Sequence, residues 1–534
     1  MLRIEDGRIV DRFSRGDADR TIDGRGLLAM TGGIDLHTHI GGGKANLARL
    51  LLYQRSAPRD ARALSSPVPP VGEAGTRYLQ MGYTTCFEPA MLAAGARAAH
   101  CEMIDMPHLN TGGYVVLGND EVLLRRLAEA ASDAEIRGYV AWMLAATQAM
   151  AVKVVNPAAV SGFKYNRRST GIDTPHPRWG VSPRQVLRRL AAALDELGLP
   201  HPLHVHCNDL GRRGNIATTL ATLDAVAGRR LHLTHAQFHC YASEGPLNFA
   251  SAAAELAARV NADRSLSIDV GQVMFGQTAT LSADVPHQFE NRRYASPRRS
   301  VFQHFECQAG CGVVPFRYRH DQFVHGLQWA IGLELFLLVQ NPWQIFLTTD
   351  HPNGGPFTSY PHLIKLLMDR GLREEILGQL HPEVRNRCAL AELSREYTLE
   401  EIAIITRSGP ARSLGLDDRV DLSTGSRADI VLYRQEADPE RMFASAEFVI
   451  RDGQIVWERG EVKESPLNKA IIRCPLPEPP ELPRGFADAW RSHLQLRPDE
   501  MWLSDDELLE QGVQLERASS GTRVLPRVSG GRSQ

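Results

Sequence analysis

Residues 30–40 read Met30-Thr31-Gly32-Gly33-Ile34-Asp35-Leu36-His37-Thr38-His39-Ile40, with two histidines one residue apart after a short apolar run. Side chains alternate between the two faces of a β-strand, so residues i and i+2 point to the same side. On a strand, His37 and His39 would therefore project together and could hold one metal ion through two imidazole nitrogens. An isolated H-x-H also occurs as two ordinary polar residues near a strand end, so the remaining sequence has to decide.

Strand-like runs alternate with helical stretches in the middle of the chain. The runs lie at residues 84–87, 151–155, 203–206, 231–235, 267–270 and 344–350. The segments between them, such as residues 183–197, have the apolar spacing of a helix that buries one face. This alternation predicts an α/β fold with enough βα units to close a (β/α)8 barrel of the TIM type. In such barrels the carboxyl ends of the strands build the active site.

The two chain ends predict a second, smaller structure beside the barrel. Residues 1–30 contain short alternating runs around tight turns, and residues 428–433 and 447–457 have the same character. Asp452-Gly453 between two apolar runs is a hairpin signal. We therefore expect a barrel of residues 31–400 and a small β-sandwich that residues 1–30 and 401–465 form together.

The last part of the chain, residues 466–534, lies outside both predicted domains. Residues 475–483 are rich in proline, and residues 519–534 are rich in Gly, Ser and Arg. This composition predicts an extended C-terminal arm with a mobile end, of the kind that wraps a partner subunit.

The overall composition is that of an ordinary globular enzyme. The 534 residues are 43% hydrophobic and 23% charged, and the formal net charge of −2 gives no reason to expect a nucleic-acid partner. The first residues lack the apolar core of a signal peptide, and no apolar run is long enough to predict a membrane span. The eight cysteines include no C-x-x-C pair and suggest reduced thiols, so we expect a cytoplasmic protein.

Further candidate metal ligands follow in the barrel region. They are Lys153 in the run 151–155, His206 and His235 at the ends of their runs, and Asp350 at the end of the last run. His204 shares a face with His206 and is an alternative ligand, although the residue next to the loop is favoured. Singly, each has an ordinary explanation, such as a lysine that reaches the surface or an aspartate that caps a loop. Together, an H-x-H followed by Lys, His, His and Asp on separate strands is what a binuclear zinc site requires.

Lys153 is unusual because the chain has only six lysines against 54 arginines. A free ammonium has no lone pair and repels divalent cations, so it cannot be a ligand. An apolar strand lowers the pKa of a lysine, and the neutral amine can then react with CO2 to form a carbamate. We therefore expect N6-carboxylysine at Lys153 as an anion that bridges two zinc ions. Lys164 is the competing lysine, but it lies in a predicted loop.

The chain resembles the amidohydrolase superfamily from its first residue to about Gly460. The resemblance rests on residues 32–39, 152–154 and 348–350, on an expected closing helix at 399–414, and on residues 425–431. A closer resemblance links this chain to the A subunits of formylmethanofuran dehydrogenases and of the formyltransferase/hydrolase complexes of methylotrophic bacteria. It rests on residues 153–157, 206–208, 314–318 and 349–358. The excess of arginine favours the bacterial type.

The resemblance implies a hydrolase that removes the N-formyl group of a methanofuran- or methylofuran-type coenzyme and releases formate. It implies one-carbon metabolism linked to tetrahydromethanopterin, with the other subunits of the complex as partners. It also implies two zinc ions, one held by His37 and His39 and the other by His206 and His235. Asp350 would take the proton of the attacking hydroxide and pass it to the leaving amine. Other divalent ions accept similar ligands, so the identity of the metal stays open.

Several polar residues are candidates for substrate contacts. Lys44 follows the H-x-H and is one of the scarce lysines, while Asn208 and Asn353 lie beside predicted ligands. Either asparagine could orient the formyl oxygen or shape its loop. The acidic tail that the resemblance implies for the coenzyme suits arginine. The candidate pairs are Arg167-Arg168, Arg212-Arg213, Arg292-Arg293 and Arg298-Arg299.

Two other functions are compatible with the sequence. A stand-alone cyclic amidase of the hydantoinase or dihydroorotase type would share the metal site but not the formyl substrate. A non-catalytic scaffold subunit would keep the barrel without the chemistry, although such proteins usually lack ligands that this chain retains.

Overall fold

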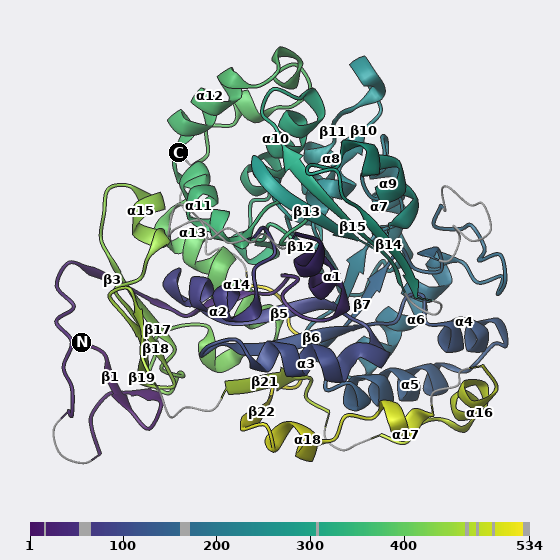
Figure 1. Cartoon of the computed structure of the whole chain (residues 1–534), viewed down its shortest axis with the longest axis horizontal. Coiled ribbons are helices and arrows are strands. Elements are labelled where there is room, and N and C mark those ends of the chain that lie inside the picture. The colour runs from purple at the N-terminus through teal and green to yellow at the C-terminus, as the bar shows by residue number, and fades with distance from the viewer. Residues whose placement is uncertain are drawn as a thin grey trace.

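The computed structural model describes residues 1–14, 18–52, 66–160, 171–282, 284–305, 309–464, 469–476, 480–493 and 497–526 (Figure 1). Parallel strands at its centre are paired in chain order: β4 (Gly33–Asp35), β5 (Tyr83–Met91), β6 (Asn110–Val116), β7 (Ala151–Val155), β8 (Leu203–His206), β9 (Leu231–Leu233), β12 (Leu266–Asp269) and β16 (Ile345–Phe346). The first and last of them approach each other where Thr38 and His351 form a parallel bridge and His39 N donates to His351 O at 2.8 Å. The predicted TIM-like barrel is confirmed.

Every residue of these strands is buried, because side chains fill the barrel and helices cover its outer face. The helices along the barrel are α2 (Val71–Gln80), α3 (Ala96–Ile104), α4 (Glu121–Ala128), α5 (Asp133–Ala146), α6 (Pro183–Glu196), α7 (Ile216–Ala225), α8 (Ala253–Ala262), α10 (Phe323–Leu338) and α11 (Tyr360–Met368). The helical segment predicted at residues 183–197 is α6. It begins at a capping box of Ser182 and Gln185 and buries Val186, Leu190 and Leu194. No helix in the described part of the chain is long and apolar enough to cross a membrane.

The two chain ends meet in an antiparallel sheet, as predicted. β3 (Leu27–Thr31) pairs with β17 (Ile430–Arg434), and β18 (Phe448–Arg451), β19 (Gln454–Glu458) and β20 (Glu461–Val462) follow in order. The hairpin of β1 (Arg3–Glu5) and β2 (Arg8–Val10) packs Ile9 against Ile430 and Ile450. Asp452 and Gly453 form the turn between β18 and β19, with the positive φ values of 47° and 78° that such a tight hairpin requires.

The expected closing helix consists of α13 (Leu399–Ala403), a π-helical turn (Ile404–Ser408) and α14 (Gly409–Ser413). Leu347 N donates to Ile405 O at 3.1 Å, so this helical segment lies against the end of β16. Residues 401–413 therefore pack against the barrel, and the C-terminal strands of the sandwich begin only at Ile430.

The C-terminal segment folds back onto the barrel as strands and helices, so the segments on either side of the proline run are not the extended arm that was predicted. The described residues of the run itself, 475–476 and 480–483, form neither helix nor strand. β21 (Lys469–Arg473) lies parallel to β6 and pairs with β22 (Val513–Arg517). α16 (Arg484–His493), α17 (Pro498–Met501) and α18 (Asp505–Leu509) lie along the bottom of Figure 1. The reason is apolar surface, since Phe486 stacks on Tyr139 with ring centroids 4.1 Å apart and Trp490 is buried beside Trp142. Residues 477–479 and 527–534 lie outside the described residues.

An insertion between β12 and α10 forms a separate sheet that the sequence patterns did not predict. Its strands are β13 (Gly276–Ser282), β14 (Val301–Phe305) and β15 (Ala309–Tyr318), and β15 lies in the middle. Thr280, Leu281, Phe316 and Tyr318 of this sheet line a cavity together with residues at the carboxyl ends of the barrel strands. The insertion thus forms one wall of the candidate site.

Candidate metal centre

Two groups of buried ligand-type side chains meet at the carboxyl ends of the barrel strands. The first contains His37 and His39, which follow β4, and Asp350, which follows β16. Asp350 Oδ1 lies 3.0 Å from His37 Nε2 and 3.4 Å from His39 Nε2. One ligand atom of each residue lies within 4.8 Å of the others, a spacing that can hold one metal ion.

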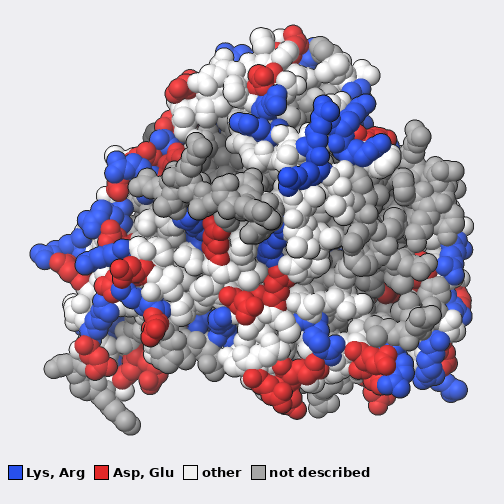
Figure 2. All heavy atoms as spheres, viewed as in Figure 1, with Lys and Arg blue, Asp and Glu red and all other residues white. Residues whose placement is uncertain are grey.

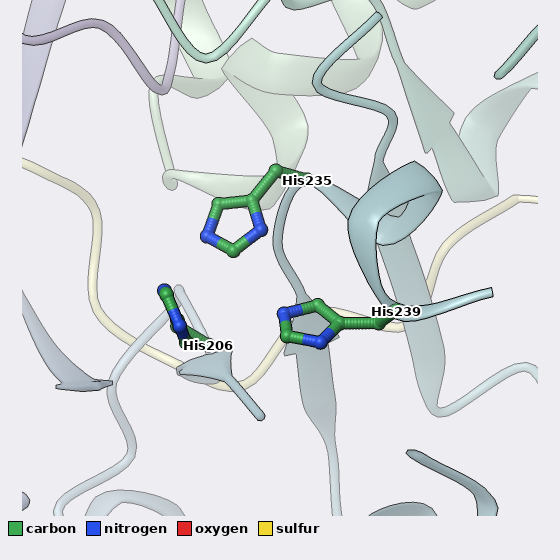
Figure 3. A group of neighbouring side chains, drawn as sticks. All are labelled: His206, His235 and His239. Carbon is green, nitrogen blue, oxygen red and sulfur yellow. The ribbon is translucent and has the colours of Figure 1, made fainter. Parts of the chain in front are cut away.

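The second group consists of His206, His235 and His239 (Figure 3). His206 ends β8, His235 follows β9, and His239 ends a short 3-10 turn, Ala236–His239. The three rings gather around one point. Their centroids are 4.6 Å apart for His206 and His235, 5.2 Å for His206 and His239, and 5.1 Å for His235 and His239. His206 Nε2, His235 Nδ1 and both ring nitrogens of His239 have no hydrogen-bond partner among the described residues.

These unpaired nitrogens fit a divalent metal ion. A buried polar atom without a partner is costly, and coordination of a metal would satisfy it. Burial lowers the pKa of His235 to about 3 and holds the pKa values of His206 and His239 well below the usual range. The imidazoles are therefore neutral near neutral pH and keep the lone pairs that a metal ion binds.

Lys153 lies beside the first group and lines the same cavity as His206 and His235. Its Nζ is 3.5 Å from His37 Nε2, and its side chain is buried. Burial lowers the pKa of Lys153 to about 8, although Asp350 acts in the opposite direction. Part of the amine is therefore neutral near neutral pH, and the neutral amine is the form that reacts with CO2.

The backbone is shaped so that ligands from different strands can converge. His235 and Asp350 have positive φ values of 36° and 49°, which are uncommon for residues with a Cβ and cluster at functional sites. Gly271, after β12, lies beside both residues with φ of +63°. A Cβ on Gly271 would lie 2.7 Å from His235 Cα and 3.4 Å from Asp350 Cβ, so only glycine fits here.

A cavity of about 710 Å³ opens onto both groups, a volume typical of small-molecule sites. His39, Lys153, His206, His235 and Asp350 line its buried end. Elsewhere it is lined by aromatic and cationic side chains, among them Phe249, Tyr294, Phe316, Arg213, Arg293 and Arg317. On the face shown in Figure 2, Lys and Arg side chains gather in the upper part of the molecule, whereas charges of both signs mix along the lower edge.

The sequence profile of the amidohydrolase family matches residues 20–457. The chain belongs to the amidohydrolase family. This amidohydrolase is 44% identical over 472 residues to the A subunit of the formyltransferase/hydrolase complex Fhc of Methylorubrum extorquens, with 86% of this chain and 85% of that protein covered. It is 37% identical over 486 residues to the protein FwdA of Methanocaldococcus jannaschii, with 86% of this chain and 84% of that protein covered.

A solved structure of the same complex is also similar to this chain. The crystal structure of the formyltransferase/hydrolase complex FhcABCD of Methylorubrum extorquens, in complex with methylofuran, contains a chain that matches this amidohydrolase with a TM-score of 0.88. The identity is 39%, and the match covers 97% of this chain and 96% of that chain. The resemblance that the motifs indicated is confirmed.

Of the two histidines on β8, His206 lines the cavity of this amidohydrolase and His204 does not. His204 Nε2 lies 2.9 Å from His37 Nδ1, and its Nδ1 lies 3.0 Å from His201 Nε2. Its spacing with His37 and Asp269 would also allow an ion, but both of its nitrogens are already hydrogen-bonded. The geometry therefore favours His206 as the ligand. Lys164, the alternative to Lys153, lies outside the described residues.

Two residues of the site were missed in the sequence. His239 lies four residues after His235, and this spacing, which can bring two histidines together on one helical turn, was the available signal. Asp269 ends β12, and its Oδ1 accepts from His235 N at 2.9 Å and from Thr348 Oγ1 at 2.8 Å. It links the backbone of His235 to the segment that leads into Asp350. Only its position at the end of a predicted strand marked it.

The predicted substrate contacts are partly placed at the cavity. Lys44 and Asn353 line it, whereas Asn208 is buried outside it. Asn353 Oδ1 already accepts from Leu281 N at 2.6 Å and so ties the insertion to the loop after β16. Of the arginine pairs, Arg213 and Arg293 line the cavity, Arg299 donates to Leu51 O at 3.1 Å, and Arg167-Arg168 lies outside the described residues.

Proposed function

We propose that this amidohydrolase removes the N-formyl group of a furan-methylamine coenzyme and releases formate, as the A subunit of a formyltransferase/hydrolase complex. The observation that carries the proposal is the convergence of two ligand groups and Lys153 at the buried end of one substrate-sized cavity. The similarity to the A subunit of Fhc, and to a complex solved with methylofuran, supports the coenzyme class and the partner subunits.

We infer that the site holds two divalent ions, and its histidine-rich donor set favours zinc. His37, His39 and Asp350 would hold one ion, and His206, His235 and His239 the other. Lys153, carboxylated on its amine, would bridge the two. When bound, such ions polarise a carbonyl group and make hydroxide available near neutral pH.

Asp350 is the candidate general acid and base. Burial raises its pKa, but the neighbouring His235 and His37 outweigh this effect and hold the pKa of Asp350 well below its usual range. Asp350 is therefore a carboxylate before the reaction and can accept the proton that the attacking water loses. An amine leaves poorly unless it is protonated, so Asp350 returns this proton to the leaving nitrogen.

The cavity lining suits a flat ring attached to an anionic tail. Phe249, Tyr294 and Phe316 offer apolar contact to the ring, and Arg213 and Arg293 offer cations to the tail. Lys44 lies on the first helix, α1 (Gly43–Leu52), and adds a further cation to the lining of the cavity. We propose that these residues place the formyl group next to His39 and Asp350.

The test is formate release from the N-formyl coenzyme. The full chain, purified with its native partner subunits, is expected to release formate from N-formylmethylofuran, to lose this activity after chelation and to regain it with Zn2+. Hydrolysis of hydantoin or dihydroorotate without formate release would instead identify a stand-alone cyclic amidase. Purified protein that has no bound metal and neither activity would identify a scaffold subunit.

A further inference from the structure

Glu88 is a buried carboxylate that the chemistry above does not use. It lies in β5 and is 3% exposed. Glu88 Oε1 lies 2.9 Å from His39 Nδ1 and accepts from Ala90 N at 3.1 Å, while Oε2 accepts from Ile40 N at 2.8 Å and from Gly41 N at 3.2 Å. Both oxygens therefore face the second histidine of the H-x-H and the backbone around it.

The contact with Nδ1 determines which nitrogen of His39 is free. An ionised carboxylate only accepts hydrogen bonds, so His39 has to carry its proton on Nδ1 to make this bond. Nε2 then keeps its lone pair, and Nε2 is the atom that faces Asp350 Oδ1 at 3.4 Å. Carboxylates that bind the far nitrogen of a ligating histidine hold the ring in one tautomer and one orientation.

His37 is supported differently. Its Nδ1 lies 2.9 Å from His204 Nε2 and 3.4 Å from Asp269 Oδ2, two groups that belong to the hydrogen-bonded interior of the barrel. Asp269 also accepts from the backbone of His235. Each histidine of the H-x-H thus has its own support, and the hydrogen bond of Glu88 is to His39.

We propose that Glu88 is a positioning residue that holds His39 protonated on Nδ1, with Nε2 directed at the metal site. The inference rests on the proposed function only in that His39 has to be a metal ligand. Loss of the Glu88 carboxylate should therefore weaken the binding of the ion that His39 holds and leave the binding of the other ion unchanged. A purely structural role in the loop at residues 40–41 would affect both ions or neither.

The test measures Zn2+ binding and not turnover. The full chain is stripped of metal and titrated with Zn2+ in competition with a chromophoric chelator, as wild type, Glu88→Gln, His39→Ala and the double variant. Glu88→Gln is expected to weaken one of the two zinc equivalents by about 10–100-fold and to leave the other unchanged. In the His39→Ala background, Glu88→Gln should have no further effect, because it acts through His39.

Glu102 provides a matched control. It also accepts a backbone N–H from this loop, Gly42 N at 2.6 Å, and it pairs with Asn46 and Arg49, but its described contacts include no histidine. Glu102→Gln is expected to keep both zinc equivalents. Melting temperatures report the folding of every variant. If Glu88→Gln does not fold, Glu88→Asp keeps the charge but shortens the reach, and the same selective loss is expected.

The outcomes separate this inference from the proposed function. Three results for Glu88→Gln would overturn the role of Glu88 alone. They are equal weakening of both zinc equivalents, no weakening of either, and an undiminished effect in the His39→Ala background. Undiminished zinc binding by His39→Ala would remove His39 from the metal site, and would overturn the ligand assignment of the proposed function together with this inference.

Discussion

Lys153 occupies a position where a permanent positive charge would oppose metal binding. Its Nζ is 3.5 Å from His37 Nε2, and burial lowers its pKa to about 8. Arginine stays protonated under all ordinary conditions, so it could neither lose a proton nor react with CO2 at this position. The proposed carboxylation would account for a lysine here in a chain that has only six lysines against 54 arginines.

Lys153→Ala is expected to lower formate release by roughly 100-fold or more, because it removes the proposed bridging anion. Part of the bound zinc should be lost as well. Short carboxylic acids such as acetate should restore some of the activity and some of the zinc by filling the vacated space. Lys153→Arg is the control, since its side chain occupies that space and no rescue is expected. A Lys153→Ala variant with full activity and full zinc content would contradict carboxylation.

Asp350→Asn is expected to lower kcat by about 100–10,000-fold, because the amide cannot take the proton of the attacking water. The substitution keeps the shape of the side chain, so the melting temperature and the zinc held by His206, His235 and His239 should change little. Turnover and zinc content are measured on the same preparation. Near-normal turnover would remove Asp350 from the mechanism.

Among the elements, α10 supports the hairpin that follows His239. This hairpin consists of β10 (Tyr241–Ala242) and β11 (Ala250–Ser251). Glu334 on α10 is buried, accepts from Ser251 Oγ at 2.5 Å and also accepts from Ala389 N. Burial raises the pKa of Glu334 to about 7. One carboxyl group thus joins the helix, the hairpin and a neighbouring loop.

The contribution of Glu334 to stability should fall as pH rises. Its folded pKa of about 7 exceeds the ordinary value of 4.5, so between these values the folded chain holds a proton that the unfolded chain has lost. The contribution is therefore full below about pH 4.5 and is lost as pH rises through about 7. Relative to Glu334→Gln, the wild type should lose up to about 3 kcal/mol over this window.

Thermal unfolding from about pH 5 to about pH 8 measures this effect through the difference between wild type and Glu334→Gln. Glu244→Gln, at an exposed position in the same hairpin region, should follow the wild type. Parallel pH profiles of wild type and Glu334→Gln would contradict the prediction.

At the scale of the whole molecule, one buried cation joins the barrel's closing helix, the sandwich and the C-terminal segment. Arg419 follows that helix, and its side chain is 2% exposed. Its two terminal nitrogens donate to the two carboxylate oxygens of Glu516 on β22 at 2.6 and 2.8 Å, and its Nε donates to Asp429 Oδ2 at 3.2 Å. Asp429 directly precedes β17 of the sandwich.

Arg419→Met is expected to destabilise the protein by about 3–5 kcal/mol, because it removes the cation that the buried Asp429 contacts and leaves the partly buried Glu516 with Arg427 at 3.5 Å. Urea or thermal unfolding measures the loss. Arg25→Met is the control, since it removes an arginine from an exposed pair with Asp23 and should change stability little. A loss no larger than that of the control would contradict the joining role of Arg419.

The amino-acid sequence by itself determined the features whose physics is local. The H-x-H after an apolar run identified His37 and His39 as a pair, although both follow β4 and do not lie on the strand that was predicted for them. The alternation of apolar runs with helical spacing predicted the barrel. Asp452-Gly453 formed its hairpin because the turn needs two residues that tolerate positive φ. The candidate ligands could be named because the parallel strands of a barrel all end on one face.

Only the tertiary structure decided which side chains meet. His204 and His206 both lie on β8, and the sequence favoured His206 only because it is next to the loop. The structure places His206 at the cavity, whereas His204 is hydrogen-bonded to His37 and His201. Glu88 reaches His39 from a neighbouring strand, so their pairing depends on how β4 and β5 are aligned. The proline-rich C-terminal segment folded back because the apolar surface of Trp490 finds cover only on the assembled barrel, and burial of that surface outweighs the local preference for an extended chain.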